Sequence, residues 1–164
     1  MKFISIIIAS KSDYSVMQEC VETLIKFGVP YELIVSSAHK SPERTKQYIQ
    51  NAEEKGAQVF IAAAGMAAHL AGTVAANTTK PVLGVPVDSG SLKGEDALLS
   101  TVMMSEGLPV GTLAIGRAGA VNAAYLAIEI LALQDDELKV KLQEDRISKA
   151  KKLELDSSEI EKIL

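Results

Sequence analysis

Residues 3–28 read FISIIIASKSDYSVMQECVETLIKFG and contain two kinds of periodicity. The first seven residues form a short run rich in β-branched side chains, which is typical of a buried strand. Apolar side chains then recur at helical spacing from Val16 to Phe27, and Gly28 ends the segment. A polar stretch, Ser10-Lys11-Ser12-Asp13, lies between the two parts. The segment therefore predicts a strand, a polar loop and a helix.

The same alternation continues along the chain. Further strands are expected at 31–35, 58–63, 81–85 and 111–115, and further helices from Pro42 to Gly56 and at 67–76, 94–103 and 118–133. Short apolar strands separated by helices predict right-handed crossovers and a mostly parallel sheet that is covered on both faces. We therefore expect a flavodoxin-like three-layer α/β/α sandwich with a five-stranded sheet.

The length of 164 residues suits a single domain. Residues 1–134 form its expected α/β core. Residues 135–164 contain nine acidic and seven basic side chains and predict a charged C-terminal helix. We find no linker or repeat that would indicate a second domain.

Composition excludes several classes of protein. The net charge of -4 argues against nucleic acid or an anionic membrane surface as a partner, and four Tyr, three Phe and no Trp leave few rings for stacking on bases or a flavin. No apolar run is long and hydrophobic enough to predict a membrane span. The single cysteine, Cys20, fits a reducing compartment, so a cytoplasmic protein is expected, and its place in an amphipathic helix predicts burial.

Polar residues gather where the predicted strands end. Ser10–Asp13 follow the first strand, Ser36–Lys40 the second and Ala64–His69 the third, and both histidines of the chain lie in these loops. Ligands bind outside the carboxyl ends of parallel strands, because loops and helix N-termini converge there. One edge of the sheet is therefore the candidate site.

Each of these loops has a structural interpretation as well as a functional one. Ser10–Asp13 suit a phosphate and a sugar hydroxyl, but they also suit a helix cap. The sequence Ser37-Ala38-His39-Lys40 suits acid–base chemistry on an anion, or an ordinary surface loop. His69 beside Gly65 suits a close-fitting ligand or tight packing, and residues 88–94 suit a lid or a turn. The sequence leaves these alternatives open.

Several chemistries lack their residues. The chain has no nucleophile elbow, no dinucleotide-binding fingerprint and no Walker loop, and its two histidines have no further ligands at metal spacing. No cofactor and no metal are therefore expected. A phosphorelay receiver would need an acidic residue at the end of the third strand, where this chain has Ala62–Gly65.

Five motifs together resemble a known family, the PurE family of N5-carboxyaminoimidazole ribonucleotide mutases. They are Ser10–Asp13, Ser37–His39, Ala67–Leu70, Val82–Val87, and Pro109–Gly116 with Ala118-Gly119. The resemblance covers nearly the whole chain. It implies transfer of a carboxylate from an exocyclic nitrogen to a ring carbon of a ribonucleotide monophosphate, without a cofactor, in a homo-octamer whose sites form between subunits.

The resemblance also implies the roles of individual residues. His39 would be the general acid and base, and the substrate would be held by Ser10, Ser12, Asp13, Ser37, Ala38, Lys40, Gly65, His69 and Leu70. The sequence departs from the family pattern at Ala9, Lys40, Met66 and Ser105, where glycine, arginine, glycine and proline are usual. A lysine at position 40 resembles the pattern of another branch of the family, whose members carboxylate aminoimidazole ribonucleotide directly with carbon dioxide. That carboxylase, and a noncatalytic sensor of phosphate sugars, are the alternatives.

Overall fold

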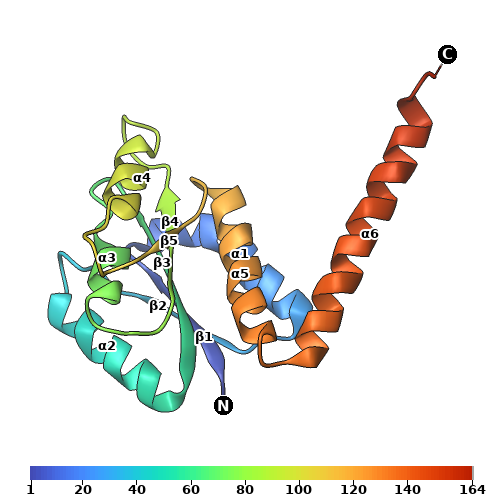
Figure 1. Ribbon diagram of the computed structural model, residues 1–164. Coiled ribbons are helices and arrows are strands. Elements are labelled where there is room, and N and C mark those ends of the chain that lie inside the picture. Colours follow the sequence, from blue (N-terminus) through green and yellow to red (C-terminus); the bar gives the residue numbers. More distant parts are fainter. Residues whose placement is uncertain (164) are drawn as a thin grey trace. The chain divides into compact units, whose positions relative to one another are not determined.

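The computed structural model describes residues 1–163 and has the expected α/β architecture (Figure 1). Its elements are β1 Phe3–Ile8, a short 3-10 helix Lys11–Asp13, α1 Tyr14–Phe27, β2 Tyr31–Val35, α2 Pro42–Lys55, β3 Ala57–Gly65, α3 Leu70–Ala75, β4 Val82–Val87, α4 Glu95–Val102, β5 Gly111–Thr112, α5 Arg117–Ala132 and α6 Asp136–Ile160. The four strand pairs among residues 1–163 are all parallel, and the strand order is β2-β1-β3-β4-β5. This is the order of a flavodoxin-like sheet.

The centre of the sheet is apolar because helices cover both of its faces. Figure 1 shows α2, α3 and α4 on one side of the sheet and α1 and α5 on the other. All six residues of β1 and all six of β4 are buried. Such continuous apolar strands are expected where no face of a parallel sheet meets water.

The chain forms two compact units. The first, Met1–Ile128, contains the whole sheet, and the second begins at Glu129. In the second unit, the Asp135 side chain caps α6 by accepting a hydrogen bond from the Leu138 N–H at 3.1 Å. The helix also carries an i,i+4 ion pair between Lys141 and Glu137 at 2.7 Å. That a single domain spans residues 1–164 stays a prediction.

Two elements are shorter than the sequence predicts. The third helix begins at Leu70 instead of Ala67, so His69 is its N-cap residue and does not lie in its first turn. The fifth strand has two residues, because only Gly111 and Thr112 are in register with β4. Beyond them the chain still follows β4 through single hydrogen bonds, such as that from the Gly116 N–H to the Pro86 carbonyl at 2.8 Å.

Candidate functional site

The strand order brings three polar loops together. Because β2 and β3 flank β1, the loops that follow them meet over the carboxyl end of β1. Two backbone hydrogen bonds join the chain segments just beyond the strand ends. The Ala9 N–H donates to the Ala63 carbonyl at 3.0 Å, and the Ser36 N–H donates to the Ile8 carbonyl at 2.9 Å. The order in which strands are added to the sheet reverses between β1 and β3. Such a topological switch point is where open α/β sheets bind ligands.

The two histidines of the chain are in direct contact at this edge. Nε2 of His39 lies 2.7 Å from Nδ1 of His69, and the two rings are nearly perpendicular, with centroids 4.8 Å apart. Residues thirty positions apart are joined in this way, although both side chains remain exposed to solvent. Neither the spacing nor the composition of the sequence predicts this contact.

The loop after β1 is a capped helix start. The Ser10 N–H donates to Oδ2 of Asp13 at 3.0 Å, and Oγ of Ser10 accepts from the Ser12 N–H at 3.3 Å, which together form a capping box. The Asp13 side chain is buried, and this burial raises the pKa of its carboxyl, while the hydrogen bond from Ser10 opposes the shift. A buried carboxylate at a sheet switch point is a feature of sites as well as of caps.

Hydroxyl groups fix the loop that carries His39. Buried Ser36 shares a 2.7 Å hydrogen bond with Oγ1 of Thr45, which also donates to the Ser41 carbonyl at 3.0 Å. Oγ of Ser41 accepts from the Ser37 N–H at 3.2 Å, so the loop is tied to the first turns of α2. Sequence reasoning missed Thr45 and Ser41, although Thr45 lies at helical spacing from Tyr48, Ile49 and Ala52 and so belongs to the inward face of α2.

The loop after β3 lies against the loop after β4. A methyl group added at Gly65 would overlap Oγ of Ser89 and would lie 3.2 Å from the Val87 carbonyl oxygen. Met66 has a left-handed backbone, with φ of 55°, and its side chain is 60% exposed. The left-handed region favours glycine, so methionine carries a backbone cost at this position.

The remaining predicted residues differ in how they are presented. Lys40 is exposed, and its N–H donates to Oγ of Ser37 at 3.1 Å. Ala38 is half-buried in the same loop. Leu70 begins α3 with its side chain in the core, so a ligand at this edge would meet its backbone. The structure therefore places the predicted residues in the three loops at this edge, apart from Gly65, which is the last residue of β3, and Leu70, which is the first residue of α3.

The prediction that Cys20 is buried is confirmed. Its side chain is inaccessible to solvent, and burial raises the pKa of the thiol to about 12. Nucleophilic work by this residue is therefore disfavoured, because the thiolate is the reactive form.

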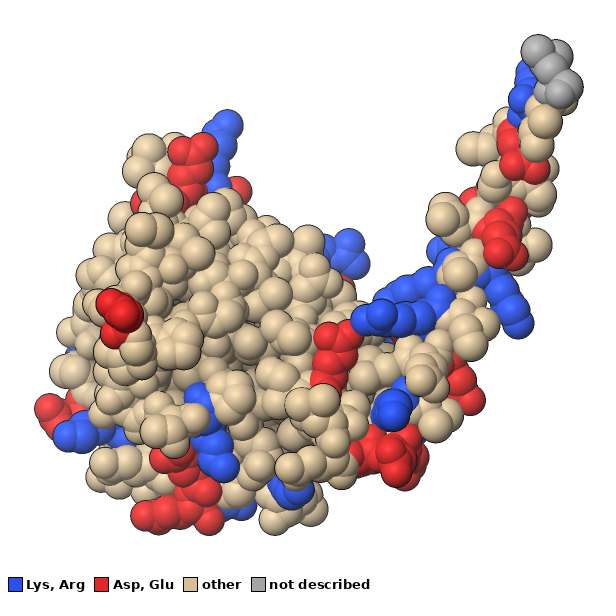
Figure 2. All heavy atoms as spheres, in the orientation of Figure 1, with Lys and Arg blue, Asp and Glu red and all other residues tan. Residues whose placement is uncertain are grey.

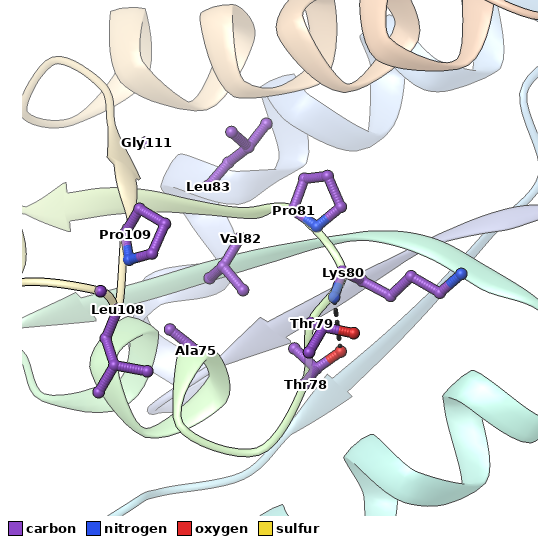
Figure 3. A pocket seen from close by; sticks show the side chains of 11 residues that line it. Ala75, Thr78, Thr79, Lys80, Pro81, Val82, Leu83, Leu108, Pro109 and Gly111 are labelled. Carbon is purple, nitrogen blue, oxygen red and sulfur yellow. Dashed lines mark hydrogen bonds between the residues drawn. The ribbon is translucent and has the colours of Figure 1, made fainter.

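A separate groove of about 550 Å³ lies at the amino end of β4 (Figure 3). Its walls include Thr78, Lys80 and Val82 on one side and Leu108 and Pro109 on the other. The Lys80 N–H donates to Oγ1 of Thr78 at 3.0 Å, which fixes the turn into the strand. The two histidines do not line this groove, so it is distinct from the carboxyl-edge site.

Two kinds of feature are absent from residues 1–163. None of these residues forms a group of three or more His, Cys, Asp or Glu side chains able to hold a metal ion. Within the same range, no helix has the length and apolar character that crossing a membrane requires.

Comparison with known proteins gives matches over most of the chain. A family model described as AIR carboxylase matches residues 3–152. The chain is 51% identical to the N5-carboxyaminoimidazole ribonucleotide mutase of Escherichia coli (strain K12) over 87% of this chain and 85% of that protein. It is 48% identical to the mutase of the same name from Bacillus subtilis (strain 168), over 95% of this chain and 96% of that protein.

A solved structure shares the fold. The crystal structure of Treponema denticola PurE superimposes with a TM-score of 0.89 at 26% sequence identity, and the match covers 99% of this chain and 100% of that chain. Both the sheet and the loops at its carboxyl edge fall within the matched range.

Proposed function

The chain belongs to the AIR carboxylase (PurE) family, and we propose that it is an N5-carboxyaminoimidazole ribonucleotide mutase of purine biosynthesis with its active site at the carboxyl edge of the sheet. The observation that carries the location of the site is the contact between His39 and His69 over the end of β1. It brings acid–base groups to the edge at which open α/β sheets bind ligands.

In the proposed reaction His39 transfers one proton out and one proton back. It protonates the exocyclic nitrogen as the bond from that nitrogen to the carboxylate carbon breaks, which gives aminoimidazole ribonucleotide and carbon dioxide. The ring carbon then attacks the carbon dioxide, and the neutral imidazole removes the proton from that carbon. One base suffices because nitrogen and carbon are close neighbours in the substrate and histidine changes charge near neutral pH.

The other loops hold the substrate in this proposal. Ser10 and Asp13 bind the ribose and phosphate region, and Ser12, Ser37 and Lys40 bind the phosphate. Ala67, which is small and exposed, leaves room for carbon dioxide beside the imidazoles. The polar residues fit these roles because Ser10, Ser12 and Lys40 are exposed at the sheet edge.

A carboxylase that uses carbon dioxide directly is the second candidate, because Lys40 stands where the mutases usually have arginine. The relatives at about half identity over most of the chain are named mutases, from both Escherichia coli and Bacillus subtilis. Ala67–Leu70 also follow the mutase pattern. These observations favour the mutase over the carboxylase and over a noncatalytic sensor.

We also propose that the protein works in the cytoplasm as a homo-octamer. Large apolar side chains remain exposed on and around α4, namely Leu92, Leu99, Val102, Met103 and Leu108. Much of the face of the first unit seen in Figure 2 carries no charge. Exposed apolar surface of this kind favours association between copies. Light scattering coupled to size-exclusion chromatography tests the stoichiometry, and a monomer at micromolar concentration would contradict it.

Two substrates distinguish the three candidate functions. Purified protein is given N5-carboxyaminoimidazole ribonucleotide in one reaction and aminoimidazole ribonucleotide with bicarbonate in another, and 4-carboxyaminoimidazole ribonucleotide is followed by absorbance. The mutase converts the first substrate efficiently, and His39→Asn abolishes that turnover. Efficient conversion of the second substrate alone would establish the carboxylase. Binding without conversion of either substrate would leave the sensor.

A further inference from the structure

We propose that His39 and His69 bind protons as one unit, with His69 acting as the positioning residue that keeps a single exchangeable proton on the pair. The inference rests on the proposed function for its role in catalysis, but the pairing itself rests on geometry. Nε2 of His39 and Nδ1 of His69 are 2.7 Å apart, a hydrogen-bonding distance. One of these two nitrogens must therefore carry a proton and the other must accept it.

This contact limits the charge states of the pair. When the pair is neutral, the facing nitrogens share one proton, and one of the outer nitrogens, Nδ1 of His39 or Nε2 of His69, carries the other. A third proton fills both outer positions and leaves the hydrogen bond intact. A fourth proton would place two N–H groups face to face and two positive charges in contact. The pair therefore exchanges one proton readily and resists binding another.

Eight charged side chains lie at the same edge of the sheet or in the elements next to it, and none of those in residues 1–163 is bonded to the histidine pair. They are Lys11 and Asp13 after β1, Lys40 after β2, Glu43 and Arg44 at the start of α2, Asp88 and Lys93 after β4, and Arg117 at the start of α5. Arg117 is engaged with Glu19 at 2.8 Å. Across residues 1–163, none of these groups forms a hydrogen bond or ion pair with either imidazole, whereas the two imidazoles are joined to each other.

The pairing suits a reaction that needs one proton twice. The pair enters the reaction with both outer nitrogens protonated and gives the proton on Nδ1 of His39 to the exocyclic nitrogen as carbon dioxide leaves. The shared proton then remains on Nε2 of His39, because Nδ1 of His69 accepts it. Nδ1 of His39 is left bare and oriented to take the proton from the ring carbon. The pair ends with the protons it had at the start.

The chain contains only these two histidines, so every histidine signal in the full-length protein reports on the pair. We would label histidine with 13C at Cε1 and follow both signals by NMR across the pH range in the substrate-free protein. The wild type is expected to show two protonation steps, with both rings responding to the first one and the second step at clearly lower pH. His39→Asn and His69→Asn are each expected to show one step.

Two independent rings would overturn the proposal: each wild-type signal would then follow one step at the same pH as in the matching single-histidine variant. The measurement does not depend on turnover. If the wild type fails to convert N5-carboxyaminoimidazole ribonucleotide, the proposed function fails while the titration still decides the pairing. Asparagine is a favoured N-cap residue, so His69→Asn is compatible with the start of α3, and circular dichroism checks that the variant is folded.

Steady-state kinetics test the catalytic role. His69→Asn can still face Nε2 of His39 with an amide group but cannot exchange a proton, and His69→Leu can do neither. We expect kcat to fall about 10- to 100-fold in the asparagine variant and further in the leucine variant, with KM within about threefold. The pH dependence of kcat in His69→Asn should follow the single step of its NMR titration. A rise in KM with kcat and pH profile unchanged would contradict the positioning role.

Discussion

Lys40 is the residue at which substrate binding and chemistry can be separated. Its exposed ammonium is a point charge at the edge where the phosphate is expected, and it would contact that phosphate equally in the ground and transition states. Lys40→Ala should therefore raise KM by about 10- to 100-fold, the cost of one charge-assisted hydrogen bond, with the single-turnover rate at saturation nearly unchanged. Lys40→Arg is the matched control and should retain tight binding. A single-turnover rate that falls by orders of magnitude would contradict this role.

The buried carboxyl of Asp13 is expected to lower the free energy of unfolding at neutral pH. Burial raises the pKa of its carboxyl, so in the window above its ordinary pKa the folded state holds a proton that the unfolded chain has released. The free energy of unfolding contributed by this group therefore falls as the pH rises through the raised pKa. Asp13→Asn keeps an acceptor for the Ser10 N–H and removes the charge.

This variant should therefore gain more thermal stability over the wild type at about pH 7 than at about pH 4. Thermal unfolding followed by circular dichroism at both pH values measures the difference. Its activity should fall at the same time, since the carboxylate is expected to bind the ribose. A stability difference that does not change with pH would show that burial does not disfavour the ionised carboxyl.

Met66 is held in a left-handed backbone that costs an ordinary residue about 1–2 kcal/mol. Met66→Gly relieves that cost and loses little packing, because the side chain is largely exposed, although glycine also has the greater entropy in the unfolded chain. We expect a net gain of up to about 1 kcal/mol in the free energy of unfolding, measured by urea denaturation. Met66→Ala keeps the unfavourable backbone and is the control. A glycine variant less stable than the alanine variant would contradict the assignment.

Among the secondary-structure elements, α2 sets the position of the proposed catalytic loop. Thr45 in this helix shares hydrogen bonds with Ser36 and with the Ser41 carbonyl, and both partners belong to the segment that carries His39. Thr45→Val preserves shape but leaves the buried Ser36 hydroxyl with only its longer contact to Ser41, at 3.5 Å. We expect a loss of about 1–3 kcal/mol in stability, measured by urea denaturation, and a lower kcat from a less ordered loop.

Thr23 provides a matched control, because it is a buried threonine in α1 whose hydroxyl donates to the Glu19 carbonyl of the same helix at 2.8 Å. Thr23→Val should cost stability without an effect on kcat. If both valine variants lower kcat equally, the hydroxyl network does not position the loop.

The ends of elements with a clear hydrophobic periodicity could be predicted from the sequence. The ends that depend on strand register or on the backbone of a turn could not. Both ends of β2 and the C-terminal end of α1 agree with the predicted ends, because an apolar run or a helical stripe ends there in glycine or a polar turn. In contrast, β5 ends where its register with β4 ends, and α3 starts late because residues 67–69 follow the left-handed turn at Met66. Both limits depend on backbone geometry that local periodicity does not record.

For the whole molecule, the alternation of strands and helices was enough to predict the sheet and the edge at which polar loops gather. The order β2-β1-β3 then determines which loops meet. The direct contact between His39 and His69, and the network through Thr45, could not be predicted, since both depend on the relative heights of loops from separate strands. Residue roles such as that of Lys40 came from family resemblance and stay predictions.

The most direct test of the proposed mutase is whether the carboxylate stays with the enzyme during transfer. N5-carboxyaminoimidazole ribonucleotide labelled with 13C in its carboxylate is converted in the presence of excess unlabelled bicarbonate, and the label in the 4-carboxy product is measured by mass spectrometry. A mutase that holds carbon dioxide beside the imidazoles predicts that nearly all of the label is retained. Product that carries the isotopic composition of the bicarbonate pool would contradict the account and would identify a carboxylase that takes carbon dioxide from solution.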